Sequence, residues 1–192
     1  MDKLKKSNRF VVGLTGRNAS GKGEAGLVLQ KHGYQYLSLS DVLRDEAALR
    51  RLEPSREVLI SLGKELREQG GPGVLAKKTI EKLGEGHYAI DSIRNPKEIE
   101  FLRQSGNFLL LGIDAPIEIR FARAQKRGRN ENASTLEDFR EMENREHSSR
   151  NPAQQLDLCM NLVDEVVQND KDLSNLSLKL SEVIRRKQFP WN

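Results

Sequence analysis

One short segment near the N-terminus constrains the fold of this chain more than any other. Residues 9–15 (RFVVGLT) form an apolar run that leads directly into a glycine-rich stretch, residues 16–23 (GRNASGKG). A short apolar run that ends at glycines is typical of a buried parallel strand entering a sharp turn. From Lys22 to His32 apolar residues recur at mostly helical spacing, and Gly33 follows as a helix terminator. The sequence therefore predicts a strand, a tight turn and a helix in direct succession.

The turn matches the P-loop pattern G-x-x-x-x-G-K, in which glycines let successive backbone N–H groups point at phosphate oxygens. The N-terminal end of the following helix adds positive charge, and Lys22 is expected to reach the β and γ phosphates of ATP. A plain glycine turn is the alternative, but the strand before it and the helix after it favour nucleotide binding. The residues expected to bind ATP here are Gly16, Arg17, Asn18, Ala19, Ser20, Gly21, Lys22, Gly23 and Glu24. Of these, Arg17 faces either the nucleotide or solvent.

Gly23 departs from the motif, because Ser or Thr at this position supplies a hydroxyl ligand to Mg²⁺. Mg²⁺ commonly keeps several waters, so phosphates, water and one carboxylate are sufficient to hold it. Asp91 ends the apolar run 87–91 (HYAID) and is the candidate metal ligand. The alternative is that Asp91 is only a polar strand terminus.

The rest of the chain alternates between strand-like and helix-like segments. Strands are expected at 34–39, 87–91, 108–113 and 162–168, and the closing helix at 173–186. Helix starts are expected at Ser40, at Ser55 after Pro54, at Asn95-Pro96, at Ser134 with Glu137 in a capping box, and at Asn151-Pro152. Strands that alternate with helices imply a parallel sheet with helices on both faces.

Two segments resemble the nucleoside monophosphate kinase group. Ser38-Leu-Ser-Asp41-Val-Leu-Arg44 is similar to the segment after the second strand of adenylate kinase and its relatives, which implies that Arg44 grips the acceptor's phosphate. Asp91-Ser-Ile-Arg94-Asn-Pro96 resembles their third-strand segment, which implies that Asp91 serves Mg²⁺ and Arg94 contacts the acceptor. The alternative for both arginines is an ordinary place on the surface.

Longer stretches are similar to a branch related to dephospho-coenzyme A kinase and deoxynucleotide kinases. They read GKGE, YLSLSDVLRDEA, ELREQGGPGVLA and DSIRNPKEIEFLR, and the resemblance covers residues 10–180. Members of this branch also occur as the kinase-like half of proteins with a deoxycytidylate-deaminase domain, which implies a possible deaminase partner. The sequence has no H-x-E with P-C-x-x-C and therefore no deaminase zinc site of its own.

Pattern and resemblance together predict an α/β three-layer P-loop fold with five parallel strands in the order 2-3-1-4-5. The 192 residues suit one domain, 1–192, with an acceptor-binding helical segment at 41–85 and a lid-like segment at 120–150. Apolar residues make up 36% and charged residues 31%, as in soluble globular proteins. No apolar run approaches the roughly 18 residues of a membrane span, and the basic start does not read as a signal peptide, so we expect a cytoplasmic protein without membrane partners.

Four further candidates are less specific. A basic cluster consists of Arg120, Arg123, Lys126, Arg127 and Arg129. Its members Arg123, Arg127 and Arg129 are at the positions of lid arginines in such kinases. Fixed guanidinium groups stabilise the charge of a transferring phosphoryl group, but a solvated basic helix end explains the cluster equally well. Asp41 is a general base if the acceptor is a hydroxyl, or only a first-turn helix residue. Asn169 lies where related kinases turn their backbone toward the adenine, or it only belongs to a turn that leads into a helix. Cys159 is expected to be a small apolar residue on a helix.

The predicted function is ATP- and Mg²⁺-dependent phosphoryl transfer to a nucleotide or nucleotide-like acceptor. Two alternatives come from other classes: a nucleotide-sensing module with little turnover that acts beside a deaminase or another partner, and an RNA-associated ATPase. The sequence pI of about 9.2 favours the RNA reading. A net charge of only +4 and 5% aromatic residues argue against nucleic acid as a partner.

Overall fold

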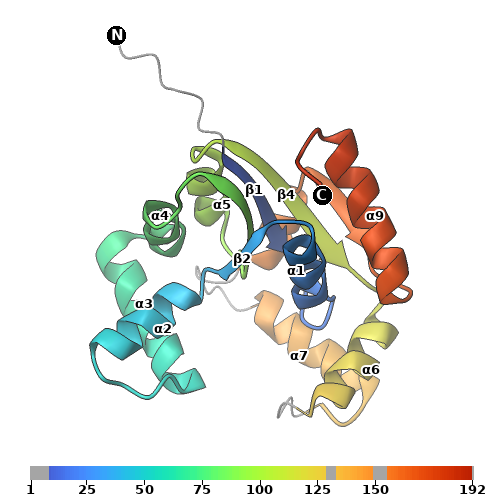
Figure 1. Cartoon of the computed structure of the whole chain (residues 1–192). Coiled ribbons are helices and arrows are strands. Elements are labelled where there is room, and N and C mark those ends of the chain that lie inside the picture. The colour runs from blue at the N-terminus through green and yellow to red at the C-terminus, as the bar shows by residue number, and fades with distance from the viewer. Residues whose placement is uncertain (1–8, 129–132, 149–154, 192) are drawn as a thin grey trace.

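The computed structural model describes residues 9–128, 133–148 and 155–191, without the side chains of 145–148. Figure 1 shows the strands side by side, with helices on both faces and around one edge. In chain order the elements are β1 (Arg9–Thr15), α1 (Lys22–Lys31), β2 (Gln35–Ser38), α2 (Asp41–Leu49), α3 (Arg56–Gly70), α4 (Val74–Glu81), β3 (Gly86–Asp91), α5 (Pro96–Arg103), β4 (Asn107–Asp114), α6 (Ile117–Arg127), α7 (Leu136–Ser148), α8 (Leu156–Asn161), β5 (Glu165–Gln168) and α9 (Leu173–Arg186).

The strands of the described chain form one parallel sheet in the order β2-β3-β1-β4-β5, which confirms the predicted fold. β1 is central, and its Gly13 is in register with Ile90 of β3 and Leu110 of β4. The carboxyl ends of parallel strands meet at one edge of a sheet, where α/β proteins bind ligands. The segments that follow β1, β2 and β3 therefore converge at this edge.

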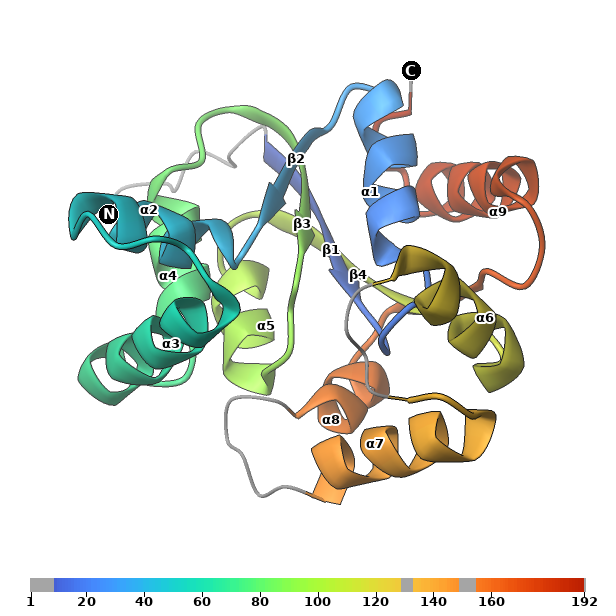
Figure 2. The same ribbon diagram turned by 90° about the horizontal axis from the view of Figure 1, so that it is seen from below.

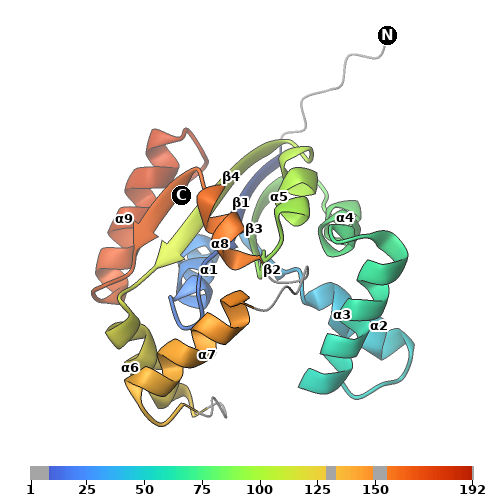
Figure 3. The same cartoon turned by 180° about the vertical axis from the view of Figure 1, so that it is seen from behind.

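The sheet is buried on both faces, because successive residues of β1 point to opposite sides. Val11 joins a core with residues of α2, α3, α4 and α5, whereas Val12 and Leu14 join a core with residues of α1 and α9. All three side chains are fully buried. Figure 3 shows α5 and α8 on the face opposite α1 and α9.

Two groups of helices flank the carboxyl edge of the sheet (Figure 2). One is the segment α2–α3–α4, and the other is the pair α6 and α7. They correspond to the segments that the sequence indicates for acceptor binding and for a lid.

Two of the helix caps predicted from the sequence are present in the structure, and two others are not. Ser55 accepts a hydrogen bond from the Val58 amide, and Asn95 forms a capping box with Glu98 while Pro96 takes the first helical position. The Ser40 hydroxyl, in contrast, makes no cap bond to α2.

The second failure concerns the capping box at the start of α7, which lies one residue later than predicted. The Asp138 amide donates to Thr135 Oγ1 over 3.1 Å, and the Thr135 amide donates to Asp138 Oδ2 over 3.0 Å. Spacing alone did not distinguish Ser134 with Glu137 from Thr135 with Asp138. The helix start predicted at Asn151-Pro152 lies outside the described residues. The last strand is also shorter than predicted: Leu162 is the C-cap residue of α8, and β5 begins only at Glu165.

Candidate nucleotide-binding site

The loop after β1 has a backbone conformation that requires glycine at two positions. Gly16 and Gly21 have φ angles of 145° and 100°. A Cβ at Gly16 would lie 2.1 Å from the Ile113 carbonyl oxygen, and one at Gly21 would lie 1.9 Å from Asn169 Nδ2. Both positions therefore exclude every other residue, and the loop curls tightly at the head of α1 as the motif predicts.

Lys22 turns back over this loop. Its Nζ donates to the carbonyl oxygens of Gly16 over 2.8 Å and of Arg17 over 2.9 Å. Burial lowers the pKa of Lys22 to about 8, because an ammonium ion loses hydration there. The lysine is therefore a buried cation held at the centre of the loop.

The charges around Lys22 are mostly positive. Arg94, Arg127 and Arg120 each lower its pKa further, whereas Asp91 is the neighbouring group that raises it. Residues from the end of β3 and from α6 thus converge on the P-loop lysine. Arg120 and Arg127 are each paired with a glutamate, but Lys22 and Arg94 together outweigh Asp91, so the site keeps a net positive charge that attracts a polyanion.

The side chains of Asn169 and Arg123 donate hydrogen bonds to the loop backbone. The Asn169 side chain is buried; its Nδ2 donates to the Ser20 carbonyl oxygen over 2.9 Å, and its main-chain amide donates to Asp114 over 2.7 Å. Arg123 donates to the Ser20 carbonyl oxygen and to Asn169 Oδ1, each over 3.4 Å. Both predicted site residues therefore contact the loop, but Asn169 does so through its side-chain amide, which supports the loop carbonyl.

Arg120 is not part of a solvated basic helix end. It is buried and forms a bidentate ion pair with buried Glu143 of α7, in which Nη2 donates to Oε2 over 3.0 Å and Nη1 to Oε1. Its Nε donates to the Ala115 carbonyl oxygen over 3.0 Å. The pair joins α6 to α7, and in the sequence Arg120 is not distinguished from the other cations of the basic cluster.

The loop also contacts the helix pair α6–α7, which nothing in the sequence pattern indicates. Ala19 has a φ of 55° and packs in a small apolar core with Ala124, Ala133 and Phe139. A left-handed alanine is uncommon and persists only where its surroundings hold it. The helix pair is therefore built onto the P-loop itself.

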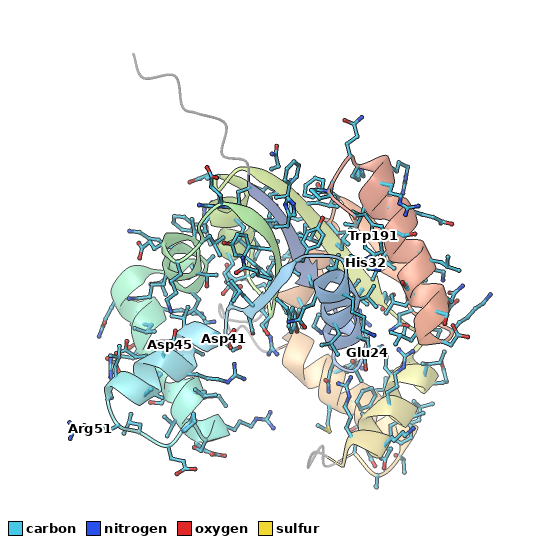
Figure 4. All side chains as sticks on the ribbon, in the orientation of Figure 1. Glu24, His32, Asp41, Asp45, Arg51 and Trp191 are labelled. Atoms are coloured by element: carbon cyan, nitrogen blue, oxygen red, sulfur yellow. The ribbon has the colours of Figure 1, made fainter. Side chains whose placement is uncertain are left out.

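Arg127, another of the arginines predicted for the lid, is at the end of α6 and pairs with Glu24 in the first turn of α1 at 3.2 Å. Figure 4 shows Glu24 at that end of α1, while His32 lies beside Trp191 at the other end. The rings of His32 and Trp191 stack with centroids 3.9 Å apart, so this histidine packs against an aromatic ring away from the loop. Arg129 lies outside the described residues.

Asp91 has both carboxylate oxygens engaged at the carboxyl end of β3. Oδ2 accepts a hydrogen bond from the Tyr36 hydroxyl over 2.9 Å, and Oδ1 accepts one from the Ser92 amide. Each oxygen keeps a further lone pair, which suits Mg²⁺ or a water bound to it. A Cβ at Gly23 would meet nothing within 4 Å, so there is room where the motif's hydroxyl would stand. In the described part of the chain no three His, Cys, Asp or Glu side chains cluster as a metal site, so Mg²⁺ fits here only with phosphates and water.

Of the acceptor candidates, Asp41 and Arg44 lie together in the first turn of α2, whereas Arg94 follows β3. Asp41 accepts from the Ser38 amide over 2.7 Å and from Arg44 Nη1 over 2.8 Å, and Figure 4 shows it apart from Glu24. Arg94 is exposed, and its charge acts on Lys22. Arg17, by contrast, pairs with Asp157 of α8 at 3.4 Å, with both side chains about half exposed.

Cys159 is fully buried in α8, and burial raises the pKa of its thiol to about 12. A thiol this basic is not a nucleophile at neutral pH, which confirms the expectation of a small apolar residue. Within the described residues no helix is long and apolar enough to cross a membrane.

Comparison with known proteins agrees with this geometry. A family model described as an AAA domain matches residues 15–140. A UPF0200 protein from Sulfurisphaera tokodaii is 32% identical over 179 residues, which cover 92% of this chain and 96% of that protein.

Two solved structures share the fold. They are TT1252 from Thermus thermophilus, with a TM-score of 0.56 and 21% identity over 93% of this chain and 97% of that one, and a shikimate kinase from Bacteroides thetaiotaomicron, with a TM-score of 0.59 and 13% identity over 94% and 99%. The predicted P-loop fold is thereby confirmed. This chain belongs to the AAA domain family and, by its sequence identity, to the UPF0200 proteins.

Proposed function

We propose that this protein transfers the γ-phosphoryl group of ATP to the phosphate of a nucleotide or nucleotide-like acceptor. The fold is that of P-loop kinases and supports nucleotide-binding phosphoryl transfer in general. The observation that carries the proposal further is the buried Lys22 ammonium, around which Arg94 and Arg127 gather from two different elements. Such a cationic centre neutralises charge on a polyphosphate and on the group being transferred.

The roles follow from position. Loop amides and Lys22 bind the donor phosphates, and Arg123 and Arg127 bring positive charge from α6. Asp91 would hold Mg²⁺, which when bound neutralises phosphate charge. Closure of the flanking helices would exclude water, which otherwise competes for the phosphoryl group.

The surroundings of Asp41 favour a phosphate over a hydroxyl as the acceptor. Its two oxygens hold the Ser38 amide and the Arg44 guanidinium, so the carboxylate serves the turn into α2. A monophosphate acceptor is already anionic and needs no base, whereas a hydroxyl must lose its proton. Arg44 and Arg94 are cations on the side where such an anion would bind.

The test is ADP release with ATP and Mg²⁺ in the presence of ribo- and deoxynucleoside monophosphates or dephospho-coenzyme A. We expect a monophosphate to stimulate turnover and Lys22→Ala to abolish it. The matched control is Lys64→Ala, since Lys64 is an exposed residue of α3 whose ion pair is with Glu68 on the same helix. Tight ATP binding without stimulation by any acceptor would contradict the kinase proposal.

That negative result would instead favour the second candidate, a nucleotide-sensing module acting beside a deaminase or another partner. Gly23 supports it, because the motif's hydroxyl ligand to Mg²⁺ is missing and nothing within 4 Å of its Cβ position takes its place. A sensor would bind ATP with Lys22-dependent affinity and hydrolyse it at the same low rate with every acceptor.

A further inference from the structure

The orientation of Asp91 is fixed from two directions. The Ser92 amide holds Oδ1, and Ser92 itself has a φ of 66°, an uncommon value for serine. The Tyr36 hydroxyl holds Oδ2 over 2.9 Å. A carboxylate bonded at one oxygen only can rotate about that bond, whereas donors to both oxygens, one on the next residue and one on β2, define its plane.

The Tyr36 ring is itself held in place. It lies against the backbone of α1 at Gly26, where a Cβ would be 2.2 Å from Tyr36 Cε2. Tyr36 therefore joins three parts of the site: β2, on which it lies, the helix that begins at Lys22, and the end of β3 that carries Asp91.

The direction of this hydrogen bond follows from the two groups: the Tyr36 hydroxyl donates, and Asp91 Oδ2 accepts over 2.9 Å.

We propose that Tyr36 is a positioning residue for metal binding: its hydroxyl holds the Asp91 carboxylate in the one orientation in which its remaining lone pairs serve Mg²⁺ or a metal-bound water. This inference rests on the role of Asp91 in the proposed function. Partners that orient a metal-binding group typically change metal affinity by 10–100-fold when removed. Among the described residues Asp91 belongs to no group of three or more His, Cys, Asp or Glu side chains that could hold a metal, so metal binding here depends on how this one carboxylate is oriented.

The chain supplies its own control. Tyr34, two residues earlier, is buried, whereas Tyr36 is partly buried, and the Tyr34 hydroxyl donates to the Pro190 carbonyl oxygen over 2.7 Å, far along the chain from Asp91. Tyr36→Phe and Tyr34→Phe each remove one tyrosine hydroxyl bond and keep the ring. Only the first touches Asp91.

The measurement is the affinity for a non-hydrolysable ATP analogue, by calorimetry, as Mg²⁺ is titrated, so that no turnover is needed. We expect Tyr36→Phe to raise the half-saturating Mg²⁺ concentration about tenfold and leave metal-free affinity unchanged. Tyr34→Phe should stay within about twofold of the wild type. Gly26→Ala, which displaces the ring and keeps the hydroxyl, should shift the Mg²⁺ concentration in the same direction and covers the case in which Tyr36→Phe folds poorly.

Asp91→Asn separates the possible failures. If it raises the Mg²⁺ requirement and folded Tyr36→Phe does not, the inference about Tyr36 is wrong and the role of Asp91 stands. If Asp91→Asn itself changes nothing, the metal assignment fails and the role of Tyr36 fails with it. Equal shifts in Tyr36→Phe and Tyr34→Phe would also overturn the inference, because they would reflect general loosening of the structure.

Discussion

The lowered pKa of Lys22 makes ATP affinity depend on pH in a defined direction. In the free protein the ammonium titrates near pH 8 instead of 10.5, chiefly because it is buried. Bound phosphates add negative charge beside it and return the pKa toward its ordinary value. Binding above pH 8 must therefore take up a proton, so affinity should be constant below pH 8 and weaken as pH rises above it.

The size of this loss of ATP affinity follows from the change in the pKa of Lys22. A change from about 8 to 10.5 is about 2.5 pKa units, or about 3 kcal/mol at 1.36 kcal/mol per unit. The dissociation constant should thus rise about tenfold per pH unit above 8 and level off after about 300-fold. Stability of the free protein changes the other way: its free energy of unfolding should rise between pH 8 and 10.5, because the unfolded chain binds the extra proton there.

Calorimetry with a non-hydrolysable ATP analogue in two buffers of different ionisation enthalpy counts the protons directly. We expect about 0.1 proton taken up at pH 7 and about 0.9 at pH 9. Tyr36 and Cys159, whose pKa values are raised, do not titrate in this interval. Lys22→Arg is the control, since arginine stays protonated and should remove the pH dependence.

Two results would refute the reasoning. One is a dissociation constant that stays flat from pH 7 to 10 in the wild type, and the other is the same slope in Lys22→Arg. Either would mean that the Lys22 ammonium is not the group to which the phosphates bind.

Two further predictions concern the architecture of the site. Glu143→Ala should lower the free energy of unfolding by about 3–5 kcal/mol in chemical denaturation, because it leaves the Arg120 charge buried without its partner. Arg120→Met combined with Glu143→Leu should recover most of this loss. Equal losses in the single and double variants would contradict the prediction. Gly21→Ala should abolish ATP binding in an equilibrium titration, because its Cβ would overlap Asn169. Gly23→Ala, whose Cβ meets nothing within 4 Å, should fold and melt like the wild type. Equal thermal stability of the two variants would show that the loop is not constrained as described.

Local signals were enough for the fold and for the location of the loop. The apolar run 9–15 followed by G-x-x-x-x-G-K predicted strand, turn and helix, and the alternation of strands and helices predicted the parallel sheet. Asp91 could be placed at the same edge as the loop because carboxyl ends of parallel strands meet there. These features depend on short-range periodicity and on general rules of connection.

Which side chains meet across the fold was decided by the tertiary structure alone. Arg120 reads as one more cation in a basic cluster, and only the packing of α7 onto α6 buries it against Glu143. Tyr36 reads as a strand residue, 55 positions from Asp91, until β2 and β3 become neighbours. Hydrogen bonds and ion pairs depend on distances of a few ångströms between groups far apart in the chain, and neither composition nor spacing contains those distances.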